Sequence, residues 1–197
     1  MYNRGKIMTE EERLLIKDWA IALRPKMRIM LNCRRDYKLD PNDTNIPSVI
    51  FDIKKKIVEI EKLEGFENEA SVGDFIGFIS RGGFIHKHID PNDLDRGLYH
   101  VRFNIFITEP QEGFKTYYDG HIVNTTEGSY ALCRSGIDYH WTEVNEDTIP
   151  RISLSFGYLL PAEKIDDLCK DHKIGIYTHL YPLVNVPREK NEKEEKD

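Results

Sequence analysis

The pattern of residues from Val72 to Leu160 restricts the fold of this chain more than any other feature. Short runs of aromatic and β-branched residues alternate with polar residues at a period of two, and Gly, Asn and Asp separate the runs. Evenly spaced short strands of this kind favour a barrel or a jelly roll. Eight strands are predicted, over residues 72–80, 83–89, 99–108, 114–118, 121–124, 129–134, 139–144 and 151–160.

Helical patterns flank the predicted strands. Thr9 and Glu12 form a capping-box pair, and apolar residues then recur at helical spacing. Three helices are predicted: about residues 10–23, Pro47 to Gly65, and 162–171.

We therefore expect an α+β fold with a double-stranded β-helix (jelly-roll) core, N-terminal helices and a short C-terminal helix. Residues 1–71 are expected to form a helical arm that packs on the core, and residues 72–187 the core with its helix. Residues 188–197 are nearly all charged and contain no apolar side chain, so we expect a disordered tail.

The charge balance and the cysteines exclude several classes of protein. The chain has 34 acidic and 28 basic residues, a net charge of −6, which speaks against nucleic acid as an obligate partner. Its three cysteines lie far apart and predict neither a disulfide framework nor a thiolate zinc cluster. Because we see no signal sequence and no run long enough for a membrane span, we expect a cytoplasmic protein. The sequence does not indicate an oligomeric state.

Candidate metal ligands lie in the segment from Gly82 to Asn92. His88 and Asp90 are two residues apart, so they project to the same side of an extended segment and can reach one ion. A second histidine, His140, follows in a later predicted strand. Two histidines and one carboxylate leave coordination positions open on an octahedral ion, an arrangement used for Fe(II) oxygen chemistry.

A candidate anion-binding pair lies in the last predicted strand. Alternation places Arg151 and Ser153 on one face of that strand. A planar guanidinium with a hydroxyl beside it can hold one end of a dicarboxylate through charge-assisted hydrogen bonds.

In this order and spacing, His88-x-Asp90, His140 and Arg151-x-Ser153 resemble the Fe(II)/2-oxoglutarate-dependent oxygenases, which are built on a double-stranded β-helix. The resemblance covers about residues 72–160. Within that family the stretch looks most like the aspartyl/asparaginyl β-hydroxylase group, which also has an arginine in the strand after the first metal motif, where this chain has Arg102. Some members of that group lack the acidic ligand, whereas Asp90 is present here.

The resemblance implies a role for each of these residues. His88, Asp90 and His140 would bind Fe(II), and Arg151 with Ser153 would bind the distal carboxylate of 2-oxoglutarate. Arg102 and Asn104 would approach its other carboxylate. With O2, such an enzyme converts 2-oxoglutarate to succinate and CO2 and hydroxylates an unactivated C–H bond, here of an Asp, Asn or Pro side chain in a peptide or protein.

Two alternatives remain open at this point. The same enzyme class can act on a free amino acid or another small metabolite. A non-catalytic, cupin-like protein would instead bind its metal through His86, His88 and His140, since His86 shares strand parity with His88. We interpret His86 as a lining or packing residue, and the polar segment 91–97 as either a substrate-contacting loop or an ordinary solvated one.

Overall fold

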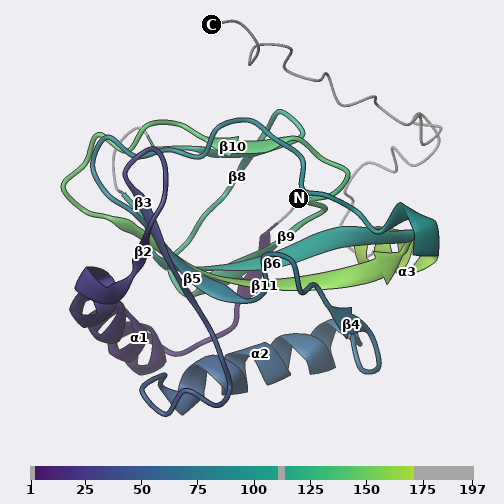
Figure 1. The fold of residues 1–197 in the computed structure, drawn as a ribbon, viewed down its shortest axis with the longest axis horizontal. Helices are drawn as coiled ribbons and strands as arrows, with labels where there is room; N and C mark the ends of the chain where they lie inside the picture. The colour runs from purple at the N-terminus through teal and green to yellow at the C-terminus, as the bar shows by residue number, and fades with distance from the viewer. Residues whose placement is uncertain (1–2, 111–113, 171–197) are drawn as a thin grey trace, which may run out of the picture.

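The computed structural model describes residues 3–110 and 114–170, and their strands form two sheets (Figure 1). In the described residues the large sheet has eight strands, in the order β1-β9-β6-β11-β5-β3-β2 with β4 paired to β11, and the small sheet has three, in the order β10-β7-β8. The large sheet contains β1 (Asn3–Lys6), β9 (Ser129–Cys133), β6 (Leu98–Thr108), β11 (Arg151–Pro161), β5 (Phe75–Ile79), β3 (Arg34–Lys38), β2 (Arg28–Ile29) and β4 (Glu67–Asn68). The small sheet contains β10 (His140–Thr142), β7 (Thr116–Tyr118) and β8 (His121–Val123).

The three predicted helices are present as α1 (Glu10–Leu23), α2 (Ser48–Glu61) and α3 (Ala162–Lys170). The Thr9 side chain accepts a hydrogen bond from the Glu12 amide, and the Glu12 carboxylate accepts one from the Thr9 amide, so the predicted capping box is confirmed. In Figure 1, α1 and α2 cover one face of the large sheet, and β8 and β10 lie on its other side. In the described ranges, no helix has the length and apolar character needed to cross a membrane.

Strand alternation divides the large sheet into a core face and a site face. On β6, Val101, Phe103 and Ile105 are fully buried in a core that they share with apolar residues of α1 and α2. The intervening Arg102 and Asn104 point to the opposite face, towards the small sheet. The polar residues on this second face of the large sheet therefore line the interior of the jelly roll, between the two sheets.

Two local predictions were wrong in detail. Helix α2 ends at Glu61 rather than at Gly65, because Lys62 adopts a left-handed conformation, with φ 54°, and the next residue, Leu63, turns into the core with 1% exposure. Burial of that side chain offsets the conformational cost at Lys62. Residues 34–38 lie outside the predicted strands, yet they form β3, whose polar sequence carries no strand pattern.

The strand predicted over residues 83–89 is not formed; the segment is extended and makes only scattered backbone hydrogen bonds. Backbone hydrogen bonds join Gly83 to Asn145 at 2.8 Å and Ile85 to Thr142 at 3.1 Å, and His88 and His140 form an isolated antiparallel bridge. The segment therefore lies along β10 and continues the small sheet.

A buried ion pair shapes the loop that precedes His140. Arg134 donates two hydrogen bonds to the Asp138 carboxylate, at 2.8 and 2.7 Å, and both side chains are 4% exposed. Such a bidentate pair holds the loop in one conformation.

Asp138→Ala is expected to lower the free energy of unfolding by about 3–5 kcal/mol, because it leaves the buried Arg134 charge without this carboxylate. Urea denaturation measures the change. The matched control is Asp167→Ala, which breaks the Lys170–Asp167 pair of the same 2.7 Å length, but at 64% exposure of Asp167. We expect the control to lose less than about 1 kcal/mol. Equal losses in the two variants would contradict this account of the loop.

Candidate metal centre

The two predicted histidine ligands form a hydrogen-bonded antiparallel pair. The His88 amide donates to the His140 carbonyl at 3.2 Å, and the His140 amide donates to the His88 carbonyl at 3.0 Å. Directly opposed residues of antiparallel strands carry their side chains on the same face. The ring centroids accordingly lie 4.1 Å apart.

Each ring has the same orientation relative to its own backbone. His88 Nδ1 lies 2.8 Å from the His86 carbonyl oxygen, and His140 Nδ1 lies 3.2 Å from the Asp138 carbonyl oxygen. A neutral imidazole in this position carries its proton on Nδ1, so Nε2 is the free lone pair. Both Nε2 atoms are thus prepared as metal ligands.

Asp90 supplies the third ligand atom. Its Oδ1 lies 3.5 Å from His88 Nε2 and 3.9 Å from His140 Nε2, and ligand atoms of the three residues all lie within 4.8 Å of one another. Burial by itself would raise the pKa of Asp90, but the neighbouring His88 ring and the Arg102 guanidinium outweigh it and lower the pKa. The carboxylate is therefore ionised, as a metal ligand must be.

This donor set fits a divalent transition metal. Two imidazole nitrogens and one carboxylate oxygen on one side of a site are the facial arrangement that non-haem Fe(II) uses. Of the three side chains, His88 is 31% exposed, so one side of the cluster is open for other ligands. The structure thus brings His88, Asp90 and His140 together as expected. His86 is exposed and lies outside the cluster, with its ring 5.0 Å from that of His88.

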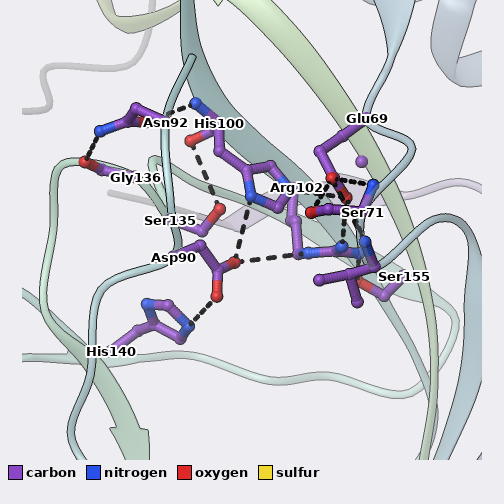
Figure 2. Close-up of polar contacts among 12 residues, drawn as sticks. Glu69, Ser71, Asp90, Asn92, His100, Arg102, Ser135, Gly136, His140 and Ser155 are labelled. Atoms are coloured by element: carbon purple, nitrogen blue, oxygen red, sulfur yellow. Dashed lines mark hydrogen bonds and ion pairs between the residues drawn. The ribbon is translucent and has the colours of Figure 1, made fainter. Parts of the chain in front are cut away.

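The Asp90 segment is fastened to the loop before His140. The Asp90 amide donates to the Ser135 carbonyl at 2.7 Å, and the Asn92 side chain donates to the Gly136 carbonyl and accepts from the His100 amide (Figure 2). A Cβ at Gly136 would lie 1.8 Å from Asn92 Oδ1, so only glycine fits there. The start of the 91–97 segment therefore has a structural role.

The second oxygen of Asp90 faces away from the two ligand histidines. Asp90 Oδ2 lies 3.5 Å from His100 Nδ1 and 3.5 Å from Arg102 Nε (Figure 2). His100 is fully buried. Burial first, and then the charge of Arg102, lower the pKa of His100 to about 4, so its ring is neutral. The carboxylate is thus held with Oδ1 directed at the metal position.

A buried acid behind these residues balances the charge of Arg102. Glu69 Oε2 lies 3.2 Å from Arg102 Nη2 and 3.5 Å from His100 Nε2. Glu69 also accepts hydrogen bonds from Ser71 and from the amides of Val72 and Gly73. Glu69 and His100 were not singled out from the sequence, because an isolated acid before the strands and a strand histidine carry no motif.

The four residues assigned to 2-oxoglutarate lie on the site face in two groups. Arg102 lies against Asp90 and Glu69 and also donates to Ser155 at 3.1 Å. Asn104 donates to the Tyr118 hydroxyl at 2.9 Å. The roles of both in cosubstrate binding stay predictions.

Arg151 lies in the second group, with Ser153 two residues along β11. Arg151 is 4% exposed, and its Nε donates to Glu109 at 3.0 Å. Within the described residues, its two terminal nitrogens donate no hydrogen bond. Burial raises the pKa of Glu109, although Arg151 partly offsets this. Arg151 therefore retains a free guanidinium edge for an incoming carboxylate, and its assignment to 2-oxoglutarate also stays a prediction.

Comparison with known proteins supports the fold. No family model matches the sequence, and no curated protein matches it. Solved structures with a similar fold include a prolyl-4-hydroxylase from Pseudomonas putida, with 15% sequence identity and a TM-score of 0.59 over 81% of this chain and 91% of that one. A viral collagen prolyl hydroxylase from Paramecium Bursaria Chlorella virus-1, solved with 2-oxoglutarate, has 12% identity and a TM-score of 0.59 over 81% and 94%.

HygX from Streptomyces hygroscopicus, solved with nickel, 2-oxoglutarate and hygromycin B, has 10% identity and a TM-score of 0.59 over 81% of this chain and 82% of that one. The predicted double-stranded β-helix fold is confirmed by these similarities. At this identity they show the fold alone, and the closer likeness to aspartyl/asparaginyl β-hydroxylases stays a prediction.

Glu69→Gln is expected to weaken Mn(II) binding by about 10–100-fold, because it leaves the Arg102 charge unbalanced beside the metal position. Isothermal titration of the purified protein measures the affinity. Glu67→Gln is the matched control, since Glu67 is an exposed acid two residues away. The double variant Glu69→Gln/Arg102→Met restores the charge balance and should recover part of the lost affinity. Unchanged affinity in Glu69→Gln would contradict this role.

The neutral, buried His100 makes the stability of the metal-free protein depend on pH. Its pKa is about 4 in the folded protein against an ordinary value of 6.5, so between these values the unfolded chain binds a proton that the folded protein does not. The stability that the neutral His100 contributes to the folded protein is fully present above pH 6.5 and is lost as the pH falls towards 4. His100→Gln should reduce the slope of unfolding free energy against pH by up to about 1.4 kcal/mol per pH unit. A slope identical to the wild-type slope would show that His100 is not responsible.

Proposed function

We propose that this protein is an Fe(II)- and 2-oxoglutarate-dependent dioxygenase that hydroxylates an Asp, Asn or Pro side chain in a peptide or protein, with release of succinate and CO2. The proposal includes a cytoplasmic location, with which its free cysteines are compatible. The observation that carries it is the open cluster of His88, Asp90 and His140, which faces Arg102 of the large sheet in a double-stranded β-helix.

The protein's own residues account for metal and cosubstrate binding. His88, His140 and Asp90 would hold Fe(II) on one side, and when bound this ion supplies the chemistry of O2 activation. Arg151 and Ser153 would hold the distal carboxylate of 2-oxoglutarate. The low dielectric around the buried Arg151 strengthens such a charge-assisted hydrogen bond. The presence of Asp90 also argues against halogenation, because the halogenases of that family lack the acidic ligand.

The surroundings of the metal position are compatible with a peptide substrate. His88 is 31% exposed, so a side chain of a bound peptide can reach the cluster from that side. The similar structures include prolyl hydroxylases, which supports a peptide or protein substrate. A small-molecule substrate is the second candidate, because HygX, with the same fold, was solved with hygromycin B.

Succinate release tests the proposal. Purified protein supplied with Fe(II), 2-oxoglutarate and O2 should form succinate, and His88→Ala should abolish both metal binding and turnover. A protein that binds the metal but forms no succinate with any plausible peptide or metabolite would contradict it.

Arg151→Gln is expected to raise the KM for 2-oxoglutarate by about 10–100-fold, since a charge-assisted hydrogen bond contributes roughly 1.5–3 kcal/mol. Mn(II) affinity should stay unchanged, because Arg151 is not a ligand. Arg151→Lys keeps the positive charge next to Glu109, so it should retain part of the affinity for 2-oxoglutarate. The rest is lost because an ammonium group does not form the paired hydrogen bonds of a guanidinium. Equal losses of metal and cosubstrate binding would indicate a structural role for Arg151.

A further inference from the structure

A second arginine shares the site face with Arg151. In the register of the large sheet, Arg34 of β3 and Arg151 of β11 are both paired with Ile79 of β5. Side chains of directly paired residues point to the same face, and two strand spacings separate the outer pair by about 10 Å. Arg34 and Arg151 therefore lie in one row across three neighbouring strands, on the same face of the sheet. Their side chains are long enough to span much of the separation between them.

The backbone just before Arg34 is hydrogen-bonded to the segment that leads to His88 and Asp90. The Ser80 amide donates to the Cys33 carbonyl at 3.2 Å, and the Phe84 amide donates to the Asn32 carbonyl at 3.3 Å. Residue 84 is four positions before His88 along an extended segment. Arg34 is therefore held at the same end of the site face as the cluster, and its charge acts on His86, His88 and Asp90.

The carboxylates near Arg34 are engaged by other side chains. Asp36, its neighbour on β3, forms a bidentate pair with Arg28 at 2.9 and 2.6 Å. Glu109 pairs with Arg151, and Asp90 faces the ligand histidines. Among residues 3–110 and 114–170, no hydrogen bond or ion pair to the Arg34 guanidinium is formed.

Arg34 is half-buried. Burial first, and the charge of Arg151 second, lower its pKa. A guanidinium that loses water without gaining an anion destabilises the folded protein, whereas an anion that binds beside it removes that cost. Its neighbour Arg35 lies on the opposite face of the same strand.

We propose that Arg34 binds a carboxylate of a ligand that enters the open side of the His88, Asp90 and His140 cluster. The inference rests on the proposed function for the nature of that ligand. Two sources supply this chemistry: 2-oxoglutarate itself, or an acidic group on the substrate. Arg102 and Arg151 each pair with a buried acid, whereas Arg34 has no acidic partner among the described residues, so its whole charge is available to a ligand.

The test compares Arg34→Gln with Arg35→Gln, which makes the same change on the other face of β3. The full chain is loaded with Mn(II), and 2-oxoglutarate is titrated by calorimetry without substrate. N-acetyl-aspartate amide is then titrated into the Mn(II) and 2-oxoglutarate complex, with N-acetyl-asparagine amide as the uncharged isostere.

Arg34→Gln should weaken one of the two carboxylate ligands by about tenfold or more, and Arg35→Gln should weaken neither. Loss at the first titration identifies the cosubstrate, and loss confined to the second identifies an acidic substrate. Arg34→Lys should retain part of the affinity. Without ligands, Arg34→Gln should be at least as stable as the wild type, because an unpaired charge is removed, whereas a structural arginine would lower the melting temperature.

Unchanged affinity for both carboxylates in Arg34→Gln overturns the inference, and so does a melting temperature that falls together with all binding. The proposed function fails separately: wild-type protein that binds Mn(II) but no 2-oxoglutarate would contradict it. In that event the aspartate titration into the Mn(II) protein alone still decides whether Arg34 binds a carboxylate.

Discussion

The two backbone hydrogen bonds between His88 and His140 are the interaction on which the site depends. They place both imidazoles on one face, because opposed residues of an antiparallel pair share a face. The surrounding contacts maintain this pairing: Thr142 binds Ile85, and the Asp90 amide binds the Ser135 carbonyl. The rigidity of the cluster therefore depends on the two short antiparallel segments that carry His88 and His140.

Buried charges around the cluster are arranged in pairs. Arg151 with Glu109, Arg102 with Glu69 and Arg134 with Asp138 each bring a guanidinium and a carboxylate together below 10% exposure. Breaking such a pair is costly, since it leaves a buried charge without its partner. The net charge of −6 of the whole chain therefore says little about the site, where cationic and anionic side chains nearly balance. Arg34 differs from the other arginines there because it has no acidic partner among the described residues.

The N-terminal part of the chain contributes more than bracing. Helices α1 and α2 cover the core face of the large sheet (Figure 1), while β3 and the loop after β4 place Arg34 and Glu69 on the site side. The division between residues 71 and 72 stays a prediction, and the strands on both sides of it belong to one sheet. The expected tail over 188–197 lies outside the described residues.

Periodicity and short-range spacing predict the helices, most of the strands and the shared side of His88 and Asp90, whereas the approach of His140 to that pair depends on a long-range backbone bridge. His88 and Asp90 share a side through strand alternation alone, and Thr9 caps its helix through a local pair of hydrogen bonds. The partners of Arg102 and Arg151 and the positions of Arg34 and Glu69 become apparent only in the folded protein. These residues meet through strand pairing over long sequence separations, and a charged side chain has no local pattern that says which distant charge it will face.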